Sequence, residues 1–171
     1  IVLCIIFLLF IFLAGPTSYI LDGLIQNLGS YVQKLLSLST STQGYSDSSW
    51  QNAWTLYYYS WWFAWSPFVG LFIARISYGR SIQEFLIGAV LVPTFIVFVW
   101  MGVFGNAAIY QEFIEPASLS TAINNDIAIS LFIFLEQFPF SQLIMWLAIV
   151  IILTFFVTSS DSGALVTSML T

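Results

Sequence analysis

The residues of this chain that are best suited to binding chemistry are aromatic and lie close together. Between positions 50 and 68 the sequence contains Trp50, Trp54, Tyr57, Tyr58, Tyr59, Trp61, Trp62, Trp65 and Phe68. Helical spacing relates Trp54 to later rings at i+4, i+7, i+8 and i+11. Side chains at these intervals project from one side of an α-helix. The sequence therefore predicts a helix with one face lined by ring surfaces.

A row of indole rings can bind a cation that has no hydrogen-bond donor. A trimethylammonium group carries charge but no N–H, and an indole face attracts it through the ring quadrupole, at about 0.5 to 2 kcal/mol per contact. No acidic residue lies between Asp47 and Glu84, so such a site would rely on rings alone. We predict that Trp61, Trp62 and Trp65 form it, because they lie about three to four helical turns beyond Trp50, near the middle of a bilayer.

Two other roles are open for these rings. Trp50, Trp54 and Tyr57 could belong to an aromatic belt at the membrane surface, and the deeper tryptophans could pack against neighbouring helices. Pro67 lies in the same segment and deprives the carbonyl of Phe63 of its helical donor. Such a break either coordinates an ion or substrate, or is a simple packing kink.

Composition indicates a membrane protein. Of the 171 residues, 60% are hydrophobic and 6% are charged, too few charges to cover a soluble domain of this size. Histidine is absent and Cys4 is the only cysteine, so neither a disulfide framework nor a thiolate metal site is expected. The carboxylates are scattered, without a convergent set of acid, base or metal ligands. We expect an all-α integral membrane protein that is not an enzyme, needs no cofactor and binds no nucleic acid.

Hydropathy divides the chain into spans and surface helices. A spanning helix needs about 20 mostly apolar residues, and we predict spans at approximately 1–15, 52–76, 84–106 and 138–160. Amphipathic or short apolar stretches predict interfacial helices at approximately 18–37 and 118–136. The chain starts at Ile1 inside an apolar run, which predicts an internal fragment of a longer protein. Arg75 and Arg80 mark the loop between the second and third spans as cytoplasmic.

Three stretches resemble one family of membrane proteins. Residues 54–85 read WTLYYYSWWFAWSPFVGLFIARISYGRSIQEF, residues 15–21 read GPTSYIL and residues 157–165 read VTSSDSGAL. They resemble the betaine/choline/carnitine transporter (BCCT) family, and together they extend the resemblance over most of the chain. Two departures are Tyr59, where family members usually have tryptophan, and Tyr78, where they often have a third arginine.

The resemblance implies a fold and a function. The family has the LeuT-type fold with two inverted five-helix repeats, so this fragment would supply about four of twelve spans in the multi-pass plasma-membrane bundle. It implies a secondary active transporter of quaternary-ammonium solutes such as glycine betaine, choline or carnitine. Such a protein would take up an osmolyte with sodium, by alternating access, often as a homotrimer. A sodium-independent betaine/carnitine exchanger is the first alternative, and a channel or a membrane sensor with the same aromatic cage is the second.

The resemblance also assigns residues. Trp61, Trp62 and Trp65 match the tryptophan box around the substrate's ammonium group. Phe68 matches an aromatic residue of one sodium site. Thr158, Ser159 and the backbone carbonyl of Phe155 match the ligands of another sodium site, and sodium is the only metal ion implied. Hydrogen bonding between helices is the alternative role for Thr158 and Ser159.

Overall fold

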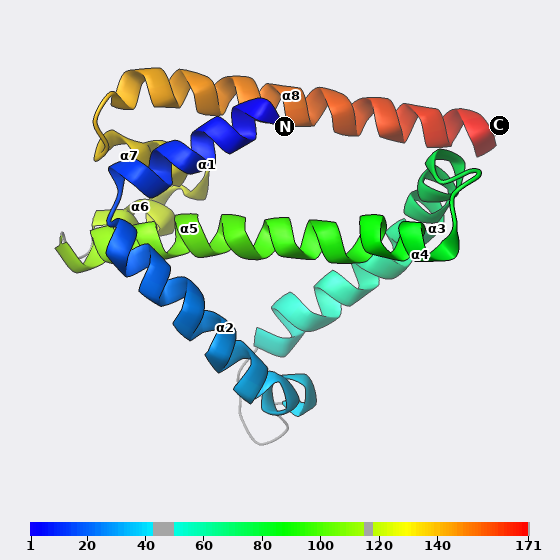
Figure 1. Ribbon diagram of the computed structural model, residues 1–171, viewed down its shortest axis with the longest axis horizontal. Helices are drawn as coiled ribbons and strands as arrows, with labels where there is room; N and C mark the ends of the chain where they lie inside the picture. Colours follow the sequence, from blue (N-terminus) through cyan, green and yellow to red (C-terminus); the bar gives the residue numbers. More distant parts are fainter. Residues whose placement is uncertain (43–49, 115–117, 171) are drawn as a thin grey trace. The chain divides into compact units, whose positions relative to one another are not determined.

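The described secondary structure of the chain is helical. The structure is a computed structural model, and it describes residues 1–42, 50–114 and 118–170. In these three stretches the chain forms helices and turns, without a strand (Figure 1), so the predicted all-α class is confirmed. The chain divides into two compact units, one of Ile1–Ser30 and Val92–Phe156 and one of Tyr31–Leu91 and Val157–Thr171.

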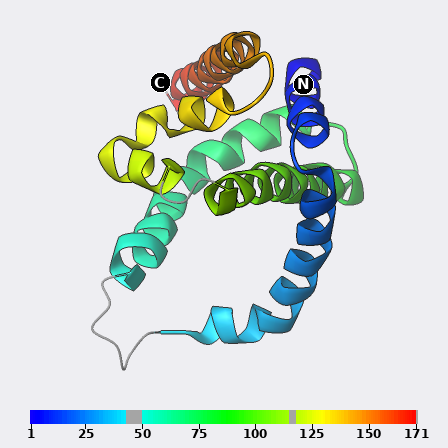
Figure 2. The ribbon, with the colours of Figure 1, turned by 90° about the vertical axis from the view of Figure 1, so that its left-hand side faces the viewer.

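The first unit is built on the contact between α1 and α5. It contains α1 (Val2–Ala14), the start of α2 (Thr17–Thr40), α5 (Val92–Ile114), and the first part of α8 (Ser141–Leu170). Figures 1 and 2 show α1 beside α5, and residues of the two helices are in contact. Its buried core consists of Phe7, Ile11, Ile20, Val103, Ala107, Phe134, Leu135, Phe138, Ile144, Ala148 and Ile151.

A sharp corner joins α1 to α2. The two helix axes differ by 109°, and Pro16 at the corner has no N–H to continue the ladder of α1. The hydroxyl of Thr17 donates to the carbonyl of Phe12 at 2.8 Å, and the N–H of Gly15 donates to Ile11 at 3.0 Å. These two bonds satisfy carbonyls that the helix end would otherwise leave open.

Two glycines allow α2 to approach α5 closely. A Cβ at Gly23 would overlap the side chain of Asn106, and a Cβ at Gly102 would overlap that of Leu24. Asn106 is 5% exposed, and its Nδ2 donates to the carbonyl of Gly102 at 2.6 Å, while Asn27 donates to its Oδ1 at 3.4 Å. The first part of α2 therefore packs closely on α5, and a side chain of each helix lies against a glycine of the other.

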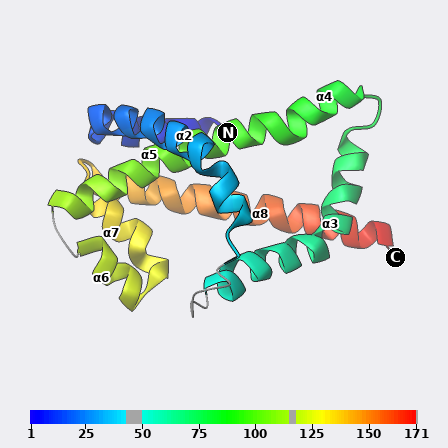
Figure 3. The same cartoon turned by 90° about the horizontal axis from the view of Figure 1, so that it is seen from below.

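Consecutive residues near the end of α5 hold the two short helices that follow. Gln111 donates through Nε2 to the carbonyl of Phe134 in α7 (Ser130–Glu136) at 3.2 Å. Glu112 accepts the N–H groups of Leu119 at 3.0 Å and Ser120 at 3.2 Å, and the Ser120 hydroxyl at 2.6 Å, at the start of α6 (Ser118–Asn125). Figure 3 shows α6 and α7 as a hairpin near this end of α5.

The second unit contains the aromatic segment. It holds the rest of α2, a π-helical segment (Gln51–Leu56), α3 (Tyr57–Ile76), α4 (Ile82–Leu86), a second π-helical segment (Ile87–Leu91) and the end of α8. Ser81 and Glu84 form a capping box that starts α4, in which Ser81 accepts the Glu84 N–H at 3.2 Å and Glu84 accepts the Ser81 N–H at 2.9 Å. Gly79, with φ +82°, turns the chain between α3 and α4.

Helix length and composition identify candidate membrane spans. Two helices among the described residues are long and apolar enough to cross a membrane, Ile82–Ile114 and Ser141–Ser168. The bent pair of α1 and α2 would add a third span if the two helices together form a single span. The segment predicted at 52–76 forms a continuous helical run, but tyrosine, tryptophan and serine lower its hydropathy. Its membrane crossing stays a prediction. The predicted 118–136 helix consists of α6, a 3₁₀ turn (Ile127–Ile129) and α7.

Candidate aromatic binding site

The rings of α3 and the preceding π-helical segment contact one another in series. Trp54 stacks on Tyr58 with centroids 5.9 Å apart and planes 10° apart. Tyr58 in turn meets Trp61 edge to face at 6.2 Å. The interval of three or four residues makes this row, because such residues are neighbours on a helix surface. The row confirms that Trp54, Tyr58 and Trp61 share a face.

Of the three predicted cage tryptophans, Trp61 and Trp62 are adjacent on one turn of α3 and Trp65 lies one turn further along. Each of them contacts a different ring. Trp61 contacts Tyr58, Trp62 contacts Tyr59 at 6.4 Å, and Trp65 contacts Phe68 at 5.5 Å. Within the part of the chain that the structure describes, they form no ring pair with each other. They are 48%, 62% and 47% exposed, so half of each indole surface is open to a ligand or to another helix.

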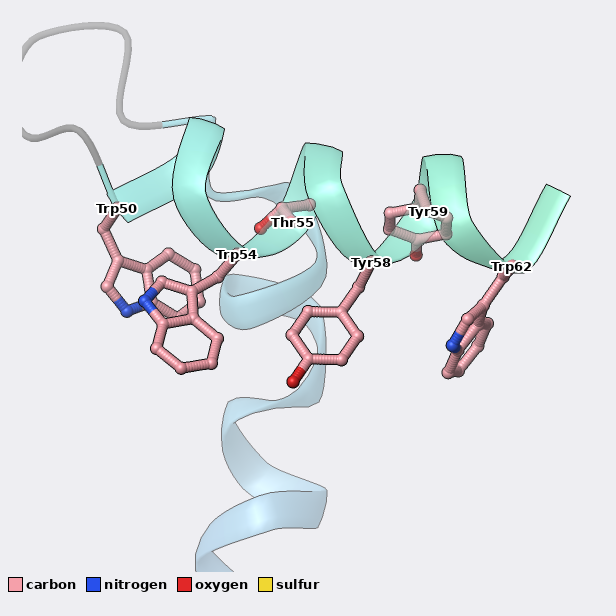
Figure 4. A pocket seen from close by; sticks show the side chains of 6 residues that line it. All are labelled: Trp50, Trp54, Thr55, Tyr58, Tyr59 and Trp62. Carbon is pink, nitrogen blue, oxygen red and sulfur yellow. The ribbon is translucent and has the colours of Figure 1, made fainter. Parts of the chain in front are cut away.

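A pocket of about 410 Å³ lies along the first part of this row. Its lining residues are Trp50, Trp54, Thr55, Tyr58, Tyr59 and Trp62. Figure 4 shows Trp50, Trp54 and Tyr58 projecting to the same side of the helix. Only Trp62 belongs both to this pocket and to the predicted cage. The sequence predicts Trp50 and Trp54 as candidates for the aromatic belt and does not predict this pocket, although the i, i+4 spacing of the two residues indicates that they share a face.

The Pro67 position is not an open break in α3. The helix continues from Tyr57 to Ile76 with Pro67 inside it. The hydroxyl of Ser66 donates to the carbonyl of Phe63 at 3.0 Å. This is the carbonyl to which residue 67 would donate if it were not a proline without an N–H. α3 therefore continues through the proline, and the choice between a binding role and a packing kink at Pro67 stays a prediction.

The residues matched to sodium sites lie on two helices. Phe68 is on α3, one turn after Trp65, and is 37% exposed. Phe155, Thr158 and Ser159 lie on about one turn of α8, and their side chains are exposed. The carbonyl of Thr158 accepts the Ser162 hydroxyl at 2.9 Å. Whether these oxygens bind sodium stays a prediction.

The two arginines of the predicted cytoplasmic loop lie at its ends. Arg75 is in the last turn of α3, where a positive charge favours the helix dipole. Arg80 directly precedes the capping residue Ser81, and its N–H donates to Ser77 at 3.1 Å. Both side chains are exposed. Across the described ranges, no group of three or more histidine, cysteine, aspartate or glutamate side chains could hold a metal ion.

Comparison with known proteins decides the family. The model of the betaine/carnitine/choline family transporter (BCCT) matches residues 1–171. This chain belongs to the BCCT family. The assignment that rested on residues 54–85 and two shorter motifs is confirmed over the whole length. The fold class follows as well, because the family consists of all-helical membrane transporters.

Curated relatives of this BCCT chain are named as transporters. It is 44% identical over 171 residues to a glycine betaine transporter of Acinetobacter baylyi, covering 99% of the chain and 26% of the relative. It is 38% identical to an ectoine/hydroxyectoine transporter of Virgibacillus pantothenticus, covering 97% and 33%. A glycine betaine/proline/choline/ectoine transporter of Vibrio parahaemolyticus is 42% identical over 88% of the chain and 27% of its own length. The BCCT chain thus spans between a quarter and a third of these relatives.

Proposed function

We propose that the protein containing this BCCT chain is a secondary active transporter of quaternary-ammonium solutes of the glycine betaine type. The observation that carries the proposal is the set of half-exposed rings on α3, with Trp61, Trp62 and Trp65 on two adjacent turns. Such rings suit a methylated cation because they attract charge and contact methyl groups at the same time. Relatives named for glycine betaine, at 44% and 42% identity, support the same class of solute.

The names of two relatives extend the solute class to ectoine. Ectoine carries its positive charge on a flat cyclic amidinium, which stacks on an indole face instead of inserting methyl groups between rings. A ring-lined site with no carboxylate on the same helix can accept either cation, because neither contact depends on a fixed hydrogen-bond donor. The transported solute is therefore proposed as a compact molecule with a delocalised or methylated cation, with glycine betaine as the first candidate.

We propose sodium as the coupling ion. Thr158, Ser159 and the Phe155 carbonyl offer oxygen ligands from one region of α8, and oxygen ligands without net charge suit a hard monovalent cation. Transport then follows if the solute and sodium bind the outward-open state and stabilise its closure. Release of both on the inside leaves the empty protein to return to the outward-open state, and the inward sodium gradient supplies the free energy. Choline and carnitine as further solutes, a role in osmoprotection and a homotrimeric assembly remain predictions from the family.

Uptake by the full-length protein tests this proposal. Purified protein in proteoliposomes is given labelled glycine betaine with an inward sodium gradient, and then with potassium replacing sodium. Trp65→Ala is compared with Phe63→Ala, a variant that removes a ring from the same helix where the side chain is 77% exposed and outside the ring row. We expect saturable sodium-dependent uptake that Trp65→Ala abolishes or weakens at least tenfold and that Phe63→Ala retains.

Each other outcome of the uptake assay indicates a different transport mechanism or a different solute. Uptake that is the same with and without sodium but requires betaine inside the vesicle would identify the exchanger. Flux that does not saturate with solute concentration would identify a channel. Absence of saturable uptake for glycine betaine, choline, carnitine and ectoine would overturn the solute assignment.

A further inference from the structure

One hydrogen bond on α3 compensates for the proline that lies among the candidate cage residues. Pro67 has no N–H, so the carbonyl four residues earlier, that of Phe63, has no backbone donor. The hydroxyl of Ser66 donates to this carbonyl at 3.0 Å. A serine hydroxyl has one proton to donate, so this bond uses the whole donor capacity of Ser66.

The cost of losing this bond depends on the surroundings of α3. At a protein surface in water, an exposed carbonyl is solvated and needs no protein donor. In a bilayer no water is available, and a proline in a helix is tolerated because a nearby serine or threonine hydroxyl, or another helix, satisfies the carbonyl that the proline leaves open. Ser66 is the residue of α3 that makes this replacement here.

The bond lies between the residues that the site depends on. Trp62 directly precedes Phe63, Trp65 directly precedes Ser66, and Phe68 directly follows Pro67. Trp65 and Phe68 are in ring contact across the proline at 5.5 Å. A change in helix direction at Pro67 would separate these two rings and rotate Trp65 relative to Trp62.

We propose that Ser66 is a positioning residue for the aromatic cage: by donating to the Phe63 carbonyl it keeps α3 regular through Pro67 and so sets the orientation of Trp65. The proposal rests on the proposed function for its transport readout, and on the hydrogen bond alone for its structural readout. Ser66 does not touch the solute in this proposal. Its effect on solute affinity passes through Trp65.

An isosteric pair of substitutions tests the hydroxyl in the full-length protein. Ser66→Thr keeps the hydroxyl, and Ser66→Val has the same shape as threonine without it. We expect Ser66→Val to raise the KM for glycine betaine about two- to tenfold, the value of one hydrogen bond, with kcat within about twofold. Ser66→Thr should retain the native KM. Ser60→Ala is the control, because Ser60 lies on the same helix without a proline after it.

A second background tests the link to the proline. In Pro67→Ala, the new backbone N–H at position 67 can donate to the Phe63 carbonyl, so the Ser66 hydroxyl becomes redundant. Ser66→Val combined with Pro67→Ala should therefore show the KM of Pro67→Ala alone, within about twofold. An equal effect of Ser66→Val in both backgrounds would overturn the proposal, and so would the absence of any effect in the native background.

Hydrogen exchange of the α3 peptides provides a readout that needs no solute. In detergent or nanodiscs, Ser66→Val should speed amide exchange around residues 63–71 several-fold, and Ser66→Thr should not. Unchanged exchange in Ser66→Val would contradict the role of Ser66, whatever the protein transports. Changed exchange without uptake of any methylated cation would keep the role of Ser66 and reject the solute assignment.

Discussion

The rings of Trp65 and Phe68 meet edge to face, with centroids 5.5 Å apart and planes at 63°. Family resemblance matches the first residue to the solute site and the second to a cation site. We propose that this contact links the solute site and the cation site predicted for these residues, on one turn of α3. A contact of this kind is worth about 0.5 to 1.5 kcal/mol, which is enough to couple two binding equilibria by a few-fold.

Removing the second ring should weaken solute binding even when sodium is saturating. We expect Phe68→Leu in the full-length protein to raise the KM for glycine betaine about two- to tenfold, because Trp65 loses its neighbour. Uptake kinetics at saturating sodium provide the measurement. In a double-mutant cycle, Trp65→Leu should largely remove the effect of Phe68→Leu. Strictly additive effects of the two substitutions would show that the ring contact carries no coupling.

The approach of α2 to α5 gives a prediction about stability. We expect Gly23→Ala to destabilise the full-length protein by about 1 to 3 kcal/mol, because the new Cβ would push the buried Asn106 side chain from its hydrogen bonds. Gly29→Ala is the control on the same helix, since a Cβ there meets nothing within 4 Å. It should be neutral or stabilising by up to about 1 kcal/mol. Thermal unfolding in detergent compares the two, and equal melting temperatures would contradict the close approach.

A disulfide tests whether the start of α2 and α5 move together. A Cβ at Gly102 would lie 3.2 Å from Leu24 Cγ, and in a disulfide the corresponding Cβ to Sγ separation is about 3.0 Å. We expect Leu24→Cys with Gly102→Cys, in a Cys4→Ser background, to form a bond under mild oxidation and to leave uptake within about twofold. Loss of uptake on oxidation that a reductant restores would show that these helices separate during transport.

Periodicity and composition predicted the helices, but not their tertiary contacts. The apolar runs predicted spans at approximately 84–106 and 138–160, which overlap α5 and α8 without matching their ends. The spacing of Trp54, Tyr58 and Trp61 predicted the face that these rings share. The interlock of Gly23 with Asn106 could not be predicted, since it depends on two residues more than 80 positions apart in sequence meeting in space. The local bond from Ser66 to Phe63 is different, because the sequence Ser-Pro contains its cause, a donor next to a proline.

Sodium dependence should respond to Thr158 in a way that a neighbouring serine does not. We expect Thr158→Ala to raise the sodium concentration for half-maximal uptake at least fivefold, because a hydroxyl oxygen is removed from a site built of uncharged oxygens. Ser160→Ala is the control, two residues later on α8 and outside the matched ligand set. Sodium titration of betaine uptake measures both variants. An identical response of the two variants, or none in either, would contradict a sodium site at this position.

Glu112 should determine the order of the α6 and α7 hairpin. Its carboxylate accepts the N–H groups of Leu119 and Ser120 and the hydroxyl of Ser120, which gives the start of α6 a charged cap from another helix. Since an amide retains only one acceptor oxygen, we expect Glu112→Gln to speed amide exchange in residues 119–125 about fivefold or more, the cost of a cap worth ~1 kcal/mol or more. Glu136→Gln, at the end of α7 with an exposed side chain, is the control and should leave exchange in these residues unchanged. Faster exchange in both variants would indicate a general effect of charge, and unchanged exchange in Glu112→Gln would show that α6 is ordered by its apolar contacts alone.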